Sequence, residues 1–371
     1  MAVFKSKSVT KDGRCWFYKT GYKDIFGASK TAVSKKFTTK KEAEMAEREF
    51  LRKIDAGIKP NDMTFQDLYE KFLENRKGKV KNTTWYDYHQ KAKYLKSLMP
   101  VKCTDFNIHQ FEEWKKQVNA TSICTRYKND VFKFLKSIMN HGMDWYGLDF
   151  LSTYRKMTNF TDPNEPIKEM LFYTYDEFKL FVGVIDDLRW KCFFETLYYC
   201  GLRRGEARGL TWDNIDWHRK CLTINKQVVD NYESGSMDKW IISSPKTRTS
   251  YRTIPICDTL YNDLRQLYDE VSKNKKFNLK YFVFGFSDHQ PVSPSSALDK
   301  RKQYADMAGV KHIRLHDFRH SCASLLINSG ANITLVAKFL GHSKIEETLN
   351  TYSHMFHSAL TDVINVMNGL E

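Results

Sequence analysis

The 371-residue sequence carries 59 lysine and arginine residues against 44 aspartate and glutamate residues, a net charge of +15. An apolar fraction of 42%, with 25 phenylalanines, 20 tyrosines and 8 tryptophans, can fill real cores and excludes a disordered chain. The length predicts two or three domains. No apolar run approaches the roughly 20 residues that cross a bilayer, and the first residues lack a signal peptide's apolar stretch.

The basic excess is concentrated near the beginning of the chain, where residues 1–60 hold 15 basic and 7 acidic side chains. A basic surface favours a polyanion such as DNA, RNA or anionic lipid, although charge alone is equally compatible with a merely soluble basic protein. The 8 cysteines are scattered without a Cys-x-x-Cys pair or a dense disulfide spacing. We therefore expect reduced thiols, no zinc site and a cytoplasmic protein.

The first predicted elements form a small sheet followed by one helix. Residues 14–37 contain short runs of aromatic and β-branched residues between turn signals, which predicts strands. Thr38 or Thr39 can cap a helix over residues 40–54 that ends near Gly57 and Pro60. The sheet carries many lysines, and a sheet of this kind can enter a DNA major groove.

Residues 63–155 have helical spacing of apolar residues, beginning at Thr64 with a pattern typical of a capping box. Four helices are predicted, over residues 64–76, 82–98, 106–118 and 125–143. Their lysine-rich faces are either solvated surface or phosphate contacts. Residues 156–166 contain two prolines and no periodicity, which indicates a linker.

The remaining residues read as a mixed domain that is mostly helical. Thr174 and Glu177 mark a helix start, and the helix over residues 186–200 ends at Gly201. Strand composition over residues 221–229, 239–244 and 251–256 predicts a small antiparallel sheet, with a basic hairpin turn at Lys246. Helices then continue almost to the C-terminus. The predicted fold class is therefore α+β, mainly α.

Four segments of this last domain hold polar residues that helical periodicity does not require. Arg203 and Glu206 are three residues apart, so on a helix they share a face and can pair, although an ordinary surface ion pair has the same spacing. Lys246 lies at a turn, where a lysine is usually just solvated. Tyr352 follows His342 by ten positions, and a tyrosine near a helix end normally packs.

His316 and Arg319 are also three residues apart, at a predicted helix start. His316 and His320 have the i, i+4 spacing of a zinc helix, but the glutamate of a His-Glu-x-x-His motif is absent, which argues against a metal. The alternative for His320 is a histidine packed in the core behind the helix.

Joined in chain order, these segments form a pattern: G-L-R-x-x-E, then K-T-x-x-S-x-R-x-I-P, then H-D-x-R-H, then L-G-H followed by T-x-x-x-Y-x-H. This pattern resembles the tyrosine recombinase (phage integrase) family, most closely the integrases of conjugative transposons and temperate phages. The resemblance implies an arm-type DNA-binding domain over residues 1–60, a helical core-binding domain over 61–157 and a catalytic domain over 158–371.

The resemblance also implies a role for each matched residue. Tyr352 would be the nucleophile, Arg203 and Arg319 the phosphate clamps, and Lys246 the general acid. His316 and His342 would complete the phosphate-binding set, with Glu206 and His320 in support. Motif spacing favours Arg203 over the neighbouring Arg204. No metal or other cofactor is implied, because the arginines supply the charge.

The implied reaction is site-specific recombination through a 3′-phosphotyrosyl intermediate, for integration and excision of a mobile element. The partners would be double-stranded DNA at core and arm sites, a homotetramer on that DNA and accessory bending or excision proteins. Residues 357–371 repeat apolar residues at helical spacing and would pack either on their own domain or on a neighbouring protomer. The alternatives are a chromosome- or plasmid-resolving recombinase, a topoisomerase-like enzyme, or a non-catalytic DNA-binding protein.

Overall fold

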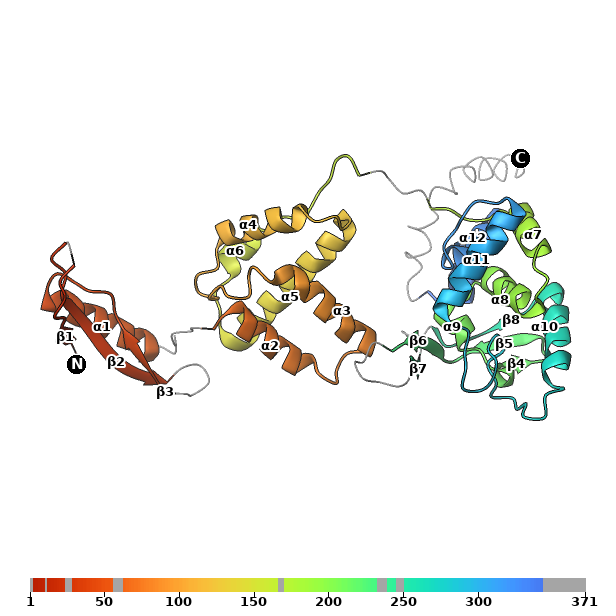
Figure 1. Cartoon of the computed structure of the whole chain (residues 1–371), viewed down its shortest axis with the longest axis horizontal. Coiled ribbons are helices and arrows are strands. Elements are labelled where there is room, and N and C mark those ends of the chain that lie inside the picture. The colour runs from red at the N-terminus through yellow and green to blue at the C-terminus, as the bar shows by residue number, and fades with distance from the viewer. Residues whose placement is uncertain are drawn as a thin grey trace, which may run out of the picture. The chain divides into compact units, whose positions relative to one another are not determined.

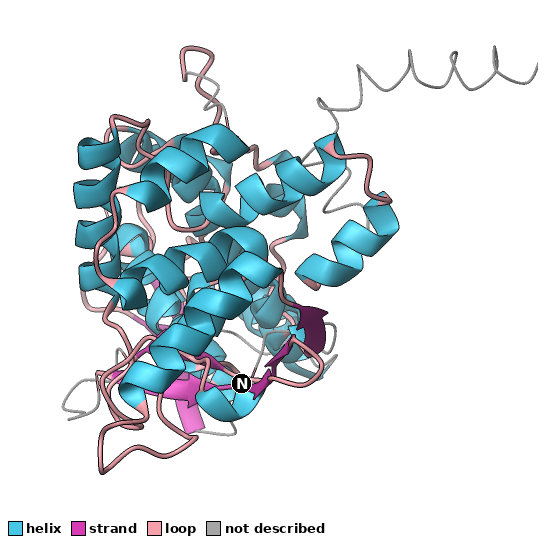
Figure 2. Cartoon of the chain, turned by 90° about the vertical axis from the view of Figure 1, so that its right-hand side faces the viewer, coloured by secondary structure: helices cyan, strands magenta, loops and turns pink. Residues whose placement is uncertain are grey.

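The computed structural model describes residues 3–10, 12–23, 29–55, 63–165, 170–231, 239–244 and 250–342. The chain divides into two compact units, Met1–Pro166 and Ile167–Glu371. Helices predominate over short antiparallel strands (Figures 1 and 2), which confirms the predicted fold class. Lys246, Tyr352 and the C-terminal tail lie outside the described residues. No helix in the described part is both long and apolar enough to span a membrane.

The beginning of the first unit is an antiparallel sheet with one helix against it. Strands β1 (Val3–Lys5), β2 (Trp16–Lys23) and β3 (Ser29–Val33) follow one another in the sheet, and α1 (Lys40–Asp55) packs on β2. The Tyr18 and Phe50 rings lie 5.7 Å apart, and Thr39 caps the helix through the Glu42 amide. The predicted sheet and helix are both present, and β1 is an additional strand.

The rest of this unit is helical. Its α-helices are α2 (Phe65–Arg76), α3 (Asn82–Ala92), α4 (Ile108–Asn119), α5 (Thr125–Tyr146) and α6 (Leu151–Lys156). Thr64 and Asp67 form the predicted capping box at the start of α2. Aromatic side chains fill the core, and the buried Trp114 donates its indole N–H to the Tyr94 carbonyl at 2.8 Å.

Two features of this unit differ from the sequence prediction. Helix α6 was not anticipated, because six residues are too few for a periodic signal. The segment predicted as a linker begins inside the core: Met157 and Phe160 are buried, and Asn129 bonds both backbone groups of Phe160 at 2.8 and 3.0 Å. The linker prediction was therefore wrong for its first residues, which seal the helical core.

The second unit is built around a buried helix, α8 (Leu188–Tyr199), which contacts both α10 (Asp258–Val271) and α12 (Asp317–Asn328). Helix α7 (Tyr175–Gly183) begins at the predicted Thr174–Glu177 capping box. The remaining helices are α9 (Arg204–Arg208), α11 (Pro294–Ala308) and α13 (Ile333–Leu340). Phenylalanine rings of α7, α8 and α12 pack together in the core.

The strands of the second unit form two separate pieces. Strands β4 (Ile215–Asp216), β5 (Cys221–Ile224) and β8 (Arg252–Pro255) make one sheet, and β6 (Gln227–Asp230) pairs with β7 (Trp240–Ser243). Figure 1 labels both pieces. The predicted hairpin at Lys246 is therefore wrong, because the strands before and after it, β7 and β8, pair with different partners. The predicted strand over residues 221–229 is likewise two strands.

Candidate active site

Arg203 stands at the junction of α8 and α9. Gly201 ends the preceding helix with a φ of 57°, a conformation that glycine adopts without strain. Arg203 is the N-cap residue of α9, where its backbone N–H and its Nη1 donate to the two carboxylate oxygens of Glu206 at 3.0 and 2.8 Å. The predicted pair is present. Glu206 is only 3% exposed, so this is no ordinary surface ion pair.

Glu206 also receives a second guanidinium that no sequence prediction assigned to the site. Arg252, on β8, donates from Nη2 to Glu206 Oε2 at 3.0 Å. Burial alone would raise the pKa of Glu206, but the Arg252 and Arg203 charges outweigh it and hold that pKa below its ordinary value. Arg252 is the arginine of the R-x-I-P motif, and nothing local in the sequence shows that it reaches Glu206.

Arg319 lies in the first turn of α12 and is 2% exposed. Its Nη1 donates to the Gly201 carbonyl at 2.7 Å, and its buried Nη2 has no hydrogen-bond partner within the described part of the chain. Burial and the charges of Arg203 and Arg252 lower the Arg319 pKa to about 9. At neutral pH this guanidinium still carries its charge, and it keeps a donor unused.

The three predicted histidines surround these arginines. His316 is the N-cap residue of α12, and its ring centroid lies 4.8 Å from that of His320. Burial, with the charges of Arg319 and Arg203, lowers the His342 pKa to about 4. Burial and His316 lower the His320 pKa to about 4, and burial with Arg319 also lowers the His316 pKa. All three imidazoles are therefore neutral at physiological pH.

The last predicted segment reaches the site through the end of α13. Gly341 caps this helix with a φ of 71°, and its carbonyl accepts a hydrogen bond from Arg203 Nη2 at 3.4 Å. Arg252 Nε donates to the Phe339 carbonyl in the same helical turn at 2.9 Å. Carbonyls at a helix C-terminus carry partial negative charge, so both guanidiniums meet a favourable dipole there. His342 follows directly.

Arg204, the alternative to Arg203, faces elsewhere. Its Nη2 lies 3.9 Å from Asp230 Oδ2, and its side chain is 42% exposed. Arg203 has two contacts with Glu206 and one with Gly341, whereas within the described residues Arg204 forms no hydrogen bond or ion pair with either. The geometry agrees with the preference for Arg203.

The site as described holds three guanidiniums and one buried carboxylate. This excess of positive charge, together with the free Arg319 donor, favours a tetrahedral anion such as a phosphate, because arginine donors match its oxygens. Six of the eight predicted site residues meet here, namely Arg203, Glu206, His316, Arg319, His320 and His342. Lys246 and Tyr352 lie outside the described residues.

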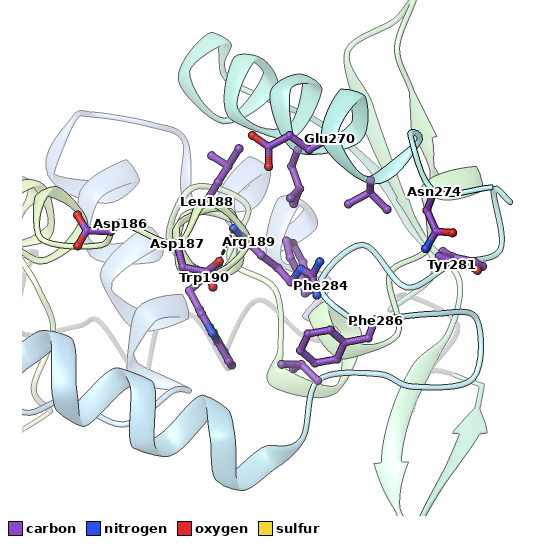
Figure 3. A pocket seen from close by; sticks show the side chains of 14 residues that line it. Asp186, Asp187, Leu188, Arg189, Trp190, Glu270, Asn274, Tyr281, Phe284 and Phe286 are labelled. Atoms are coloured by element: carbon purple, nitrogen blue, oxygen red, sulfur yellow. Dashed lines mark hydrogen bonds between the residues drawn. The ribbon is translucent and has the colours of Figure 1, made fainter. Parts of the chain in front are cut away.

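A larger hollow in the same unit contains none of the predicted site residues. Its volume is about 780 Å³, and it lies between the start of α8 and the end of α10. Figure 3 shows Arg189 and Phe286 side by side in it, 4.6 Å from guanidinium carbon to ring centroid. A second hollow of about 660 Å³ includes Arg252, Gly341 and His342, so it borders the arginine site. By volume alone, the first hollow would therefore be chosen ahead of the one that borders the arginine site.

Two family models match the chain. Residues 172–358 match the phage integrase family, and residues 5–54 match an arm DNA-binding domain. The first match spans every motif segment of the site and covers half of the chain, and the second lies on β1 to β3 and α1.

Individual relatives agree with these matches. A tyrosine recombinase XerC-like protein of Caldanaerobacter subterraneus subsp. tengcongensis is 28% identical over 352 residues, 90% of each chain. The ICEBs1 integrase of Bacillus subtilis is 27% identical over 219 residues, 55% of each chain, so the match spans about half of that relative.

Solved structures share the fold. The Tn1549 transposon integrase in complex with transposon right end DNA matches with a TM-score of 0.70 and 22% identity, over 82% of this chain and 100% of that one. A lambda integrase tetramer bound to a Holliday junction matches with a TM-score of 0.53 and 14% identity, over 91% and 95%.

Proposed function

The chain belongs to the phage integrase family of tyrosine recombinases, and we propose that it integrates and excises a mobile element by covalent attack of Tyr352 on DNA. The observation that carries the proposal is the excess positive charge of the arginine site within the described residues, where Arg319 Nη2 also has no hydrogen-bond partner. A buried charge without a partner is costly, so a site that retains one is built for an anion from outside.

Arg203 and Arg319 would hold the two non-bridging oxygens of the scissile phosphate. In-line attack on a phosphodiester raises negative charge on these oxygens, and fixed guanidiniums meet that charge without reorganisation. Glu206 and the Gly341 carbonyl already hold Arg203, and the Gly201 carbonyl holds Arg319. The donors are therefore in place before DNA binds, which is the condition for electrostatic preorganisation.

The covalent step would be a transesterification. The Tyr352 hydroxyl loses its proton to solvent water and its oxygen forms a bond to phosphorus. The bond from phosphorus to the 5′ oxygen breaks, and Lys246 gives its proton to that oxygen. The products are a 3′-phosphotyrosyl linkage and a free 5′-hydroxyl. A 5′-hydroxyl from a second duplex then attacks the same phosphorus and releases Tyr352. Because the bond energy is conserved, this cycle needs no ATP.

The histidines would act as neutral hydrogen-bond donors to the phosphate. Their lowered pKa values leave His316 and His342 uncharged at neutral pH. A bound phosphate would raise both pKa values by offsetting the arginine charge. His320 touches His316 edge to face and would set the orientation of its ring.

The three regions of the chain would divide the contacts with DNA. Residues 1–60 would bind arm-type sites, residues 61–157 the core site, and residues 158–371 the scissile phosphate. The match of residues 5–54 to an arm DNA-binding domain supports the first role. Strand exchange between two duplexes needs four active sites, so a homotetramer on DNA is expected. The lambda integrase tetramer on a Holliday junction supports this assembly by analogy of fold.

The second candidate is a chromosome- or plasmid-resolving recombinase. The XerC-like relative favours it, whereas the additional arm-type region favours the integrase. A resolvase with two domains has no use for a second class of DNA site. Binding of residues from the first region to a sequence separate from the core site would therefore support the integrase.

A nicked suicide duplex, built from the DNA that flanks the encoding gene, tests the proposal. Cleavage beside the nick releases a short strand and traps the covalent complex. We expect an adduct that resists detergent with the unaltered chain and none with Tyr352→Phe. Tight binding without an adduct would instead make this chain a non-catalytic DNA-binding protein of the same fold.

A further inference from the structure

Arg252 is a buried arginine whose contacts join three segments of the site. It lies on β8, and its side chain is 6% exposed. Nη2 donates to Glu206 at 3.0 Å, Nε to the Phe339 carbonyl at 2.9 Å and Nη1 to the Ser250 carbonyl at 3.2 Å. The three acceptors belong to α9, to α13 and to the chain immediately before β8. One side chain therefore fixes elements that lie far apart in sequence.

The contact with Glu206 controls the position of Arg203. Glu206 Oε1 accepts from the Arg203 side chain, and Oε2 accepts from both the Arg203 backbone and Arg252. A carboxylate held at both oxygens keeps one rotamer, and the Arg203 fork is then aligned by it. Without Arg252, the buried Glu206 would lose one of its two cations, and its orientation would depend on Arg203 alone.

The contact with Phe339 acts on the same guanidinium from the other side. Arg203 Nη2 donates to the Gly341 carbonyl, two residues beyond the carbonyl that Arg252 holds. Both arginines thus bond to carbonyls at the end of α13, and Arg252 does so from strand β8. His342 follows this turn directly, so its position depends on the same anchor.

We infer that Arg252 is a positioning residue of the recombination site, which aligns Arg203 through Glu206 and fixes the end of α13 beside it. This inference rests on the proposed function. We assign Arg252 a positioning rather than a catalytic role, because each of its three nitrogens already donates to the protein. Arg319, by contrast, keeps Nη2 without a partner in the described part of the chain. The effect of Arg252 on the reaction passes through Arg203.

A substrate whose scissile phosphate carries no charge can distinguish a positioning role of Arg252 from a merely structural one. Replacing one non-bridging oxygen by a methyl group removes the charge that Arg203 is there to meet. A defect caused by a misplaced Arg203 should therefore shrink on the methylphosphonate, whereas a defect caused by a damaged fold should be the same on both substrates.

The test measures single-turnover adduct formation on the nicked duplex with a phosphodiester or a methylphosphonate at the cleavage site. For Arg252→Met we expect a loss of about tenfold to a hundredfold on the phosphodiester, the range typical of residues that orient others. On the methylphosphonate the loss should fall to within about threefold of the unaltered chain. Arg252→Lys keeps the charge, so it should recover part of the phosphodiester rate and serves if the methionine variant does not fold.

Arg208→Met is the matched control. Arg208 is also buried, with 2% of its side chain exposed, and it too binds a carbonyl and a carboxylate, those of Val292 and Asp230. Its losses should be equal on the two substrates. If each Arg252 variant lost the same activity on the phosphodiester as on the methylphosphonate, the inference would be overturned and Arg252 would be structural. Full activity of Arg252→Met would also overturn the inference. Absence of any adduct with the unaltered chain would instead contradict the proposed function.

Discussion

The second unit contains two partly buried charged clusters with opposite imbalances of charge, one around Glu206 and one around Glu195. The arginine site joins Arg203, Arg252 and Arg319 to the single carboxylate of Glu206. The other cluster lies between α8 and α10, where Glu195 and Asp263 face one ammonium, that of Lys191. Glu195 is 1% exposed and Arg319 is 2% exposed, so water screens the charge of neither group well.

The two clusters differ in whether a change of protonation can remove the excess charge. Burial, and then the Asp263 charge and hydrogen bond, raise the pKa of Glu195 to about 8, so this carboxyl takes up a proton at neutral pH and the excess disappears. An arginine cannot respond in this way, because even the lowered Arg319 pKa of about 9 leaves it charged. Protonation therefore removes the excess charge of the acidic cluster, whereas the arginine site keeps its excess within the described residues, as expected if the proposed anion comes from outside. This difference separates packing from function.

The largest effect is expected from replacing Arg319, which tests whether this residue serves packing or function. Arg319→Met should lower the rate of adduct formation by about a thousandfold, because it removes a donor to the transition state. Its melting temperature should stay equal or rise, because replacing a poorly paired buried charge by an apolar side chain is often neutral or stabilising. Calorimetry beside the adduct assay checks both. A lower melting temperature with the lost activity would mark Arg319 as a structural residue.

A smaller effect distinguishes the two adjacent arginines. Arg203→Ala should lower the rate about a hundredfold, whereas Arg204→Ala, which removes a long contact to Asp230, should stay within about threefold. The matched pair controls for a change of charge on α9. Equal losses in the same assay would show that net charge, rather than the geometry at Glu206, determines the rate.

The smallest effect lies in the acidic cluster and depends on pH. The Glu195 pKa is raised above its unfolded value of 4.5, so the stability from the protonated form is full below that value and is lost as pH rises through about 8. At pH 9, Glu195→Gln should therefore melt a few degrees higher than the unaltered chain, at about 2–4 °C per kcal/mol. At pH 5 the two chains should melt at the same temperature. Cleavage should be unchanged. A gain that is the same at both pH values would contradict a titrating Glu195.

Several helix starts and one ion pair of the arginine site could be predicted because their sequence signals are local. The Thr64 and Thr174 capping boxes and the i, i+3 pair of Arg203 and Glu206 depend on residues within one helical turn. The link between Glu206 and Arg252 spans 46 positions, and its existence depends on which strand pairs with which. Sequence periodicity shows that a strand exists, but it does not reveal the partner, so β7 and β8 were wrongly joined.

The burial of Met157 and Phe160 escaped prediction for a related reason. Prolines and polar residues later in the segment indicated a linker, but the apolar side chains at its start close a core built by helices earlier in the chain. Composition over a window averages these two parts together. The roles of Lys246 and Tyr352 stay predictions from the motif, because both residues lie outside the described chain.

The central claim, that the arginine site is completed by a phosphate from outside, is tested most directly by titrating His342. Histidine-selective NMR of the full chain would follow its imidazole against pH, with and without saturating inorganic phosphate. We predict a pKa of about 4 without phosphate and a clearly higher value with it, and no such rise in Arg319→Met. The same pKa with and without phosphate would contradict the account.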